Sequence, residues 1–240
     1  PLFISNIFQQ LYNTVDTMIV GNFLGDASLA AIGSCTSIYD LLVGFALGIG
    51  NGLAIVTARS FGSKDEKLLK KSVASSLVIG IVVSIGLTLI GLIFLQPLLH
   101  LLNTPTNIID EAYSYIFFIV MFAYNLCAGL MRAIGNSVMP LVFLVVSSVL
   151  NIILDLVFIT QLNMGVQGAA VATVISQGTS VILCIIYMFK KTPLLLPKKE
   201  HFEVDKDLYK ELLGQGFSMG LMSCIVSAGS VILQYGINNL

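Results

Sequence analysis

The stretch "SSVLNIILDLVFIT", residues 147–160, is the part of the sequence that decides the fold. It is almost entirely aliphatic, and together with its apolar neighbours it approaches the ~20 residues that an α-helix needs to cross a bilayer. Asn151 and Asp155 interrupt it, and because they are four residues apart they share one face of a helix. Lipid offers no hydrogen-bond partners for these two side chains, so the face that carries them must lie against protein or a water-filled cavity. The stretch therefore predicts a transmembrane helix with one polar face.

The whole chain has the composition of a membrane protein. Of its 240 residues, 56% are hydrophobic and only 10% are charged, whereas a soluble globular domain carries about 25% charged residues. The four cysteines form no CxxC pair, which argues against a zinc site or a disulfide framework. No basic stripe with interleaved aromatic residues is present, so we expect no nucleic-acid partner. The chain also lacks a Walker motif, so we do not expect it to drive transport with ATP by itself. We also expect neither an enzyme nor a cofactor.

Seven apolar segments predict an all-α polytopic membrane protein in contact with the lipid bilayer. The expected spans are residues 1–20, 28–57, 73–95, 108–131, 140–161, 167–189 and 212–237. The polar segment 190–211 is rich in proline and charge and is typical of a linker between two membrane units. Because the chain begins at Pro1 and ends beside an apolar run, we expect it to be a piece of a longer protein.

The basic residues predict the orientation in the membrane. All 12 lysines and arginines fall at 59–71, at Arg132 or at 190–210, which are the loops after the second, fourth and sixth spans. Lys and Arg are enriched in cytoplasmic loops. We therefore expect these three loops and the N-terminus in the cytoplasm, with the chain in the cell (inner or plasma) membrane.

Of the 13 acidic residues, Asp110 and Glu111 lie at the very start of a predicted span, whereas Asp16, Asp40 and Asp155 lie further inside one; no basic residue lies in any span. An aspartate at the centre of a membrane helix costs about 2.5–3.5 kcal/mol on insertion scales. Intramembrane carboxylates usually mark ion pathways, proton relays or substrate sites. The alternative is an aspartate that is protonated, or that only hydrogen-bonds to a neighbouring helix.

Other polar residues recur on helix faces near these carboxylates. They are Asn6, Gln9, Asn13 and Asp16 in the first span, Ser147, Asn151 and Asp155 in the fifth, and Thr173, Ser176 and Gln177 in the sixth. Carboxylate, amide and hydroxyl oxygens are hard ligands that suit Na⁺, and a carboxylate can also exchange a proton. These faces therefore predict a site for a small cation inside the bundle.

Four stretches resemble the multidrug and toxic compound extrusion (MATE) family, in particular its bacterial DinF-like branch. They are "YNTVDTMIVGNFLGDASLAAIG" (12–33), "RSFGSKD" (59–65), "GLMRAIGNSVMPL" (129–141) and "NIILDLVFI…GVQGAAVATVISQ" (151–177). The resemblance implies twelve helices in two six-helix lobes. This chain would supply the N-lobe (1–190, its first helix truncated), a cytoplasmic linker (191–211) and a truncated first helix of the C-lobe (212–240), and its partner would be the remaining C-terminal lobe.

The resemblance also implies roles for single residues. A cation site of the family falls on Asp16, Asn151, Asp155 and Thr173, where Na⁺ or H⁺ would bind. The family's first-helix proline, at which that helix bends, falls on Pro1. Asp40 matches no family role. We expect it to line the cavity together with Gln9, Asn13, Ser147 and Gln177.

The expected function is that of an antiporter that exports amphipathic, cationic drugs or toxic organic compounds, driven by Na⁺ or H⁺. A lipid-linked oligosaccharide flippase of the same superfamily is the alternative, although it should show basic residues in its cavity, and these spans have none. A retinal protein would need a lysine in the seventh span, which has none within 212–237. An intramembrane protease would need paired catalytic aspartates, which here requires Asp16 and Asp155 to meet, or a Ser–His pair.

Overall fold

The computed structural model describes most of the chain. Side chains are described for residues 41–90, 93, 119–165 and 167–229, and for residues 3, 4, 7, 8, 11, 14, 15, 18, 19 and 22. Only the backbone is described for 26–40, 91–92, 94–101, 108–118, 166 and 230–238. All statements below concern these residues.

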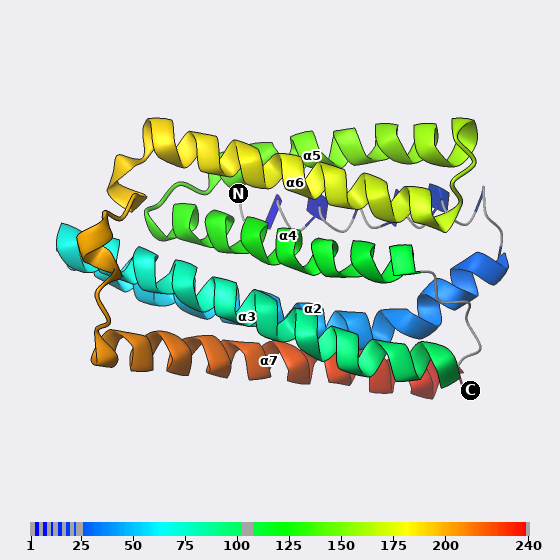
Figure 1. The fold of residues 1–240 in the computed structure, drawn as a ribbon, viewed down its shortest axis with the longest axis horizontal. Helices are drawn as coiled ribbons and strands as arrows, with labels where there is room; N and C mark the ends of the chain where they lie inside the picture. Colours follow the sequence, from blue (N-terminus) through cyan, green and yellow to red (C-terminus); the bar gives the residue numbers. More distant parts are fainter. Residues whose placement is uncertain are drawn as a thin grey trace.

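The described part of the chain is a bundle of long helices that run side by side (Figure 1). The α-helices are α2 (Asp26–Gly62), α3 (Glu66–Leu101), α4 (Ile108–Ala133), α5 (Val138–Leu156), α6 (Val166–Lys191) and α7 (Lys206–Asn238). A π-helical turn, η1 (Val157–Gln161), continues α5, and two 3₁₀ turns, η2 (Pro193–Leu195) and η3 (Lys199–Phe202), connect α6 to α7. The described residues between 3 and 22 are also helical.

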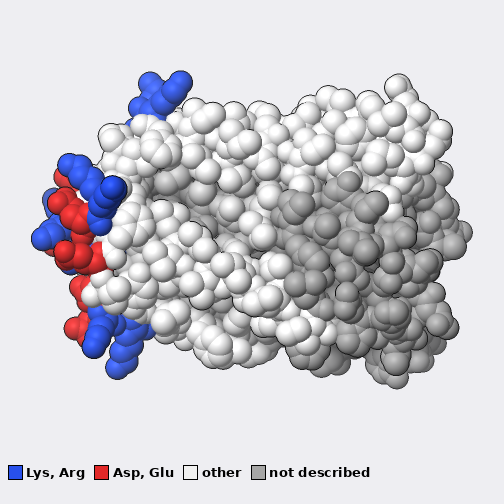
Figure 2. Space-filling view, in the orientation of Figure 1, with Lys and Arg blue, Asp and Glu red and all other residues white. Residues whose placement is uncertain are grey.

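Five of these helical stretches are long and apolar enough to cross a membrane. They are Leu41–Gly62, Glu66–Ile90, Val138–Gln161, Gln167–Lys191 and Lys206–Gly229. Many large apolar side chains point away from the protein, such as Ile225 and Phe189, which are 73% and 64% exposed. On the face drawn in Figure 2, the charged side chains gather at one end and the rest of the described surface is uncharged. The prediction of an all-α polytopic membrane protein is confirmed.

The helix ends differ from the predicted loops. Only residues 63–65 separate α2 from α3, so most of the predicted loop 59–71 is helical. Likewise, α7 begins at Lys206, six residues before the expected 212, and shortens the predicted linker. Lys and Glu are good helix formers, and Asp65 and Asp205 cap the new helix starts by accepting the N–H groups of Leu68 (3.0 Å) and Leu208 (3.2 Å).

The main core contains buried residues from all six α-helices and reaches the charged end of the bundle. Leu53 of α2 and Leu130 of α4 are fully buried in it. So are Leu195 of η2 and Leu212 of α7. The connection between α6 and α7 is therefore part of the same core as the helices. Its Leu195 is buried against their apolar side chains, which removes apolar surface from water.

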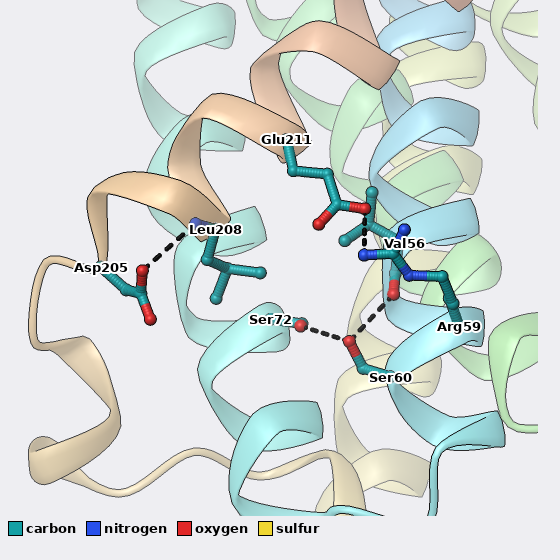
Figure 3. A network of polar contacts seen from close by, with 7 residues as sticks. All are labelled: Val56, Arg59, Ser60, Ser72, Asp205, Leu208 and Glu211. Carbon is teal, nitrogen blue, oxygen red and sulfur yellow. Dashed lines mark hydrogen bonds and ion pairs between the residues drawn. The ribbon is translucent and has the colours of Figure 1, made fainter.

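Helix α7 packs along α2 at unusually close range. A Cβ atom placed on Gly48 would lie 2.4 Å from the carbonyl oxygen of Met219, and one on Gly52 would lie 2.5 Å from that of Gln215. At the charged end, Arg59 forms an ion pair with Glu211 of α7 (Figure 3). The glycines allow the two backbones to meet, as small residues do in membrane helix pairs.

Candidate cation site between α5 and α6

The polar face predicted for α5 is buried in the bundle. Ser147, Asn151 and Asp155 recur every four residues and are 3%, 0% and 0% exposed. On the other side of the helix, Val149 and Ile153 are 53% and 52% exposed. The helix therefore turns its apolar side outward and its polar side inward, as expected for a membrane helix that lines a polar interior.

Asn151 joins α5 to α6. In one orientation of its amide, Nδ2 donates a hydrogen bond to Oγ1 of Thr173 at 3.2 Å. In the reverse orientation, which satisfies both ends of the amide, Nδ2 donates to Oδ2 of Asp155 at 2.9 Å. Its Oδ1 then accepts from the backbone N–H of Thr173 at 3.1 Å and from its hydroxyl at 3.2 Å. Asn151, Asp155 and Thr173 thus form one contiguous oxygen-rich cluster.

In the first amide orientation, in which the Thr173 hydroxyl accepts from Asn151, the hydroxyl donates its one proton to the carbonyl of Ala169 at 3.0 Å. One turn further along α6, the Oε1 atom of Gln177 is buried and has no hydrogen-bond partner among the described residues. Buried amide oxygens are costly unless they are satisfied. Gln177 therefore offers one more acceptor on the helix that carries Thr173.

A small apolar cluster lies near the polar residues. Ile159 of the π-helical turn η1 and Ala169 of α6 pack with Ile19 of the first segment, and Val15 and Ile152 pack against them. Val15 and Ile19, both of the first predicted span, thus lie against α5 and α6. The π-helical turn begins two residues after Asp155, and such turns are frequent beside functional sites. Sequence periodicity did not predict this turn, since its residues are as apolar as the rest of the span.

The described residues do not include every member of the predicted site. Pro1, Gln9, Asn13 and Asp16 lie outside them, and the backbone of Asp40 belongs to α2 while its side chain is not described. The structure brings together Asn151, Asp155 and Thr173 and buries Ser147 on the same face of α5. Within the described residues no group of three or more His, Cys, Asp or Glu could hold a metal ion. Among the described residues, a site here would therefore rely on amide and hydroxyl oxygens beside the carboxylate of Asp155.

Comparison with known proteins identifies the family. A family model described as MatE matches residues 1–157. The chain is 32% identical over its whole length to the probable multidrug resistance protein YoeA of Bacillus subtilis (strain 168). The chain belongs to the MATE family. It is also 27% identical, over 97% of its length, to the multidrug export protein MepA of Staphylococcus saprophyticus. It covers 54% and 53% of these two relatives, so it spans about half of their length.

Solved structures of MATE transporters share the fold. The chain matches the inward-facing conformation of a multidrug resistance MATE family transporter of the MOP superfamily with a TM-score of 0.80, at 25% identity. The matched region covers 92% of this chain and 51% of the transporter chain. The outward-facing conformation of such a transporter matches with a TM-score of 0.81 over 98% of this chain and 52% of that one, also at 25% identity. The likeness therefore extends to both conformations and does not assign the chain to one of them.

Proposed function

We propose that this chain is part of a cation-coupled antiporter that exports amphipathic, cationic organic compounds. The buried contact of Asn151 with Asp155 and Thr173 carries the proposal, because it places a carboxylate, an amide and a hydroxyl together inside a membrane bundle. Na⁺ prefers such hard oxygen ligands, and a proton could bind the same carboxylate. The names of the relatives, which refer to multidrug resistance and export, support drug efflux as the transport process.

The proposed coupling follows from the burial of the site. Asp155 is 0% exposed, so a cation that reaches it leaves water and exchanges its hydration for protein oxygens. Binding shifts the balance between outward-open and inward-open states only if the cation prefers one of them. Asp16 of the first segment is proposed to complete the site, and the packing of Val15 and Ile19 against α5 and α6 supports this placement.

The charged end of the bundle is proposed to face the cytoplasm. The described lysines and arginines that Figure 2 shows gather there, and residues 198–203 lie beside the lysines of α3 at the same end. Positive charge is enriched on the cytoplasmic side of membrane proteins. In this orientation the chain supplies the N-lobe and the linker, and α7 would be the first helix of a C-lobe supplied by the remainder of a longer protein.

An efflux assay on the full-length parent protein tests the proposal. Cells that express the wild type are loaded with ethidium and compared with cells that express Asp155→Asn, with and without Na⁺ and at two external pH values. We expect efflux that follows one ion gradient and falls at least tenfold in the variant, because the amide cannot carry the charge that binds the cation. Ser148→Ala, on the same helix, is the matched control, since its hydroxyl only donates to the carbonyl of Leu144 at 2.8 Å.

Two outcomes would contradict the proposal. Efflux that is equal in the wild type and in Asp155→Asn would remove the cation role of this carboxylate. No efflux from wild-type cells, with the protein present in the membrane, would favour the flippase. In that case, transfer of a lipid-linked oligosaccharide across vesicles would be measured next.

A further inference from the structure

An apolar groove lies on the outside of the bundle, between α3, α4 and α6. Its volume is about 560 Å³. Its walls include Ile81 and Ile85 of α3, Phe122 of α4, and Ile185 and Phe189 of α6. Ile81, Ile85 and Phe189 are 61%, 56% and 64% exposed, so the groove opens on the apolar surface that faces lipid. In Figure 1, α4 lies between α3 and α6, and its residues Phe122 and Leu126 line the groove.

Residues 195–197 of the connection between α6 and α7 also line the groove. This connection lies against α3, which both η2 and η3 contact. Leu195 is fully buried and anchors it. Lys198, which follows residues 195–197, donates its backbone N–H to Nδ1 of the buried His201 at 2.9 Å. This hydrogen bond holds the turn in place. The connection therefore passes directly from residues that line the apolar groove to residues that line a charged segment.

A second cavity of about 550 Å³ lies at this charged segment. Three lysines line it, namely Lys67, Lys70 and Lys198, together with three glutamates and His201. Lys70 and Ile81 are eleven residues apart, about three helical turns, so the two cavities occupy the same side of α3. Residues 195–197 line the groove and Lys198 lines the charged cavity, so the two cavities adjoin along the connection as well as along α3.

The charges of this cavity balance each other but are only partly paired. Glu66 forms an ion pair with Lys70 at 2.8 Å, and Glu200 lies 3.8 Å from His201. Within the described residues, Lys67, Lys198 and Glu203 form no ion pair. Two ammonium groups are therefore available for a phosphate, and a carboxylate is available for a cation. This pattern complements a headgroup that carries both charges and can donate hydrogen bonds.

We propose that the groove and the charged cavity together bind one phosphatidylethanolamine molecule of the adjoining leaflet. An acyl chain lies in the apolar groove between α3 and α6. The phosphate contacts Lys67 and Lys198, and the ammonium contacts Glu203. The lipid then joins α3 to the connection that leads into α7. This proposal does not depend on the transported substrate or on the coupling ion.

The chemistry distinguishes this lipid from its neighbours in a bilayer. Phosphatidylcholine shares the phosphate, but its quaternary ammonium has no N–H group to donate to a carboxylate. Phosphatidylglycerol shares the phosphate but has no positive charge to offset Glu203. The site should therefore prefer the ethanolamine lipid to both.

Native mass spectrometry of the purified full-length parent protein tests the proposal. Protein that has been stripped of lipid is titrated with the palmitoyl-oleoyl forms of phosphatidylethanolamine, phosphatidylcholine or phosphatidylglycerol. We expect one tightly bound phosphatidylethanolamine, with at least fivefold weaker binding of the other two. Lys67→Gln with Lys198→Gln should weaken it at least fivefold, and Glu203→Gln should reduce the preference over phosphatidylglycerol. The charge control is Lys64→Gln with Lys210→Gln, on exposed lysines outside the cavity.

A second variant tests the groove itself. Ser84 lines it, and Ser84→Trp should fill it and release the lipid. Val82→Trp, on the same helix but pointing at lipid (63% exposed), should leave binding unchanged. Equal binding of the three lipids, or a tighter adduct with phosphatidylglycerol, would overturn the proposal. So would phosphatidylethanolamine binding that the lysine variants leave unchanged, which would show only an annular lipid.

Discussion

The close contact of α2 with α7 predicts that Gly48→Ala destabilises the protein. The added Cβ would lie 2.4 Å from the carbonyl oxygen of Met219 and 2.6 Å from the Cα of Gly220. Ordinary contacts of a Cβ begin at 3.4 Å, so the helices must separate by about 1 Å (3.4 − 2.4) at this point. Both of these atoms belong to backbone, which cannot rotate out of the way as a side chain would.

A matched variant isolates the magnitude of this contact. In a helix, alanine is favoured over glycine by about 1 kcal/mol, and overpacking a well-packed interior costs about 1–3 kcal/mol. Gly214 lies at an exposed position of α7, and no atom is within 4 Å of a Cβ added there. Gly214→Ala therefore gains the helix-propensity contribution and has no overpacking cost. The difference between the two variants is then the overpacking cost, about 1–3 kcal/mol.

Thermal unfolding of the full-length parent protein measures this difference. Each variant is fused to a fluorescent protein, solubilised in the same detergent and heated, and the folded fraction is read by size-exclusion chromatography. We expect Gly48→Ala to melt below the wild type and Gly214→Ala to melt at or above it. If Gly48→Ala stabilises the protein as much as Gly214→Ala does, α2 and α7 do not meet at Gly48 and the reasoning is wrong.

Two further predictions concern helix pairs. A Cβ on Gly44 would lie 2.9 Å from Oγ of Ser227, so Gly44→Cys with Ser227→Cys should form a disulfide under mild oxidation in a background without the native cysteines. The same test on Gly44→Cys with Gly229→Cys is the control, and cross-linking of both pairs alike would argue against the packing. Thr173→Val removes the hydroxyl next to Asn151 and should weaken the ion dependence of efflux about tenfold, which corresponds to about 1.4 kcal/mol. Thr179→Val, whose hydroxyl only donates to the carbonyl of Ile175, should not change it, and equal effects of both threonine variants would remove the role of Thr173.

The sequence predicted those features that depend on neighbours along the chain. Hydrocarbon leaves a backbone no partner but itself, so a long apolar run is enough to predict a helix. A spacing of four residues is enough to place Asn151 and Asp155 on one face, which the structure buries. The helix ends were less predictable. Charged residues near 65 and 205 indicated loops, but caps at these positions extended α3 and α7 into the charged segments.

The amino-acid sequence by itself determined that this chain is a helical membrane protein with a carboxylate facing its interior. Only the tertiary structure decided which helices meet. The contact of Asn151 with Thr173 joins residues on two helices, and helical spacing within either of them cannot predict it. The contact between Gly48 and Gly220 joins residues even further apart in the chain. The same is true of the groove, which is lined by residues of α3, α4 and α6. Such contacts depend on how whole helix surfaces fit together, and helical periodicity describes only one helix at a time.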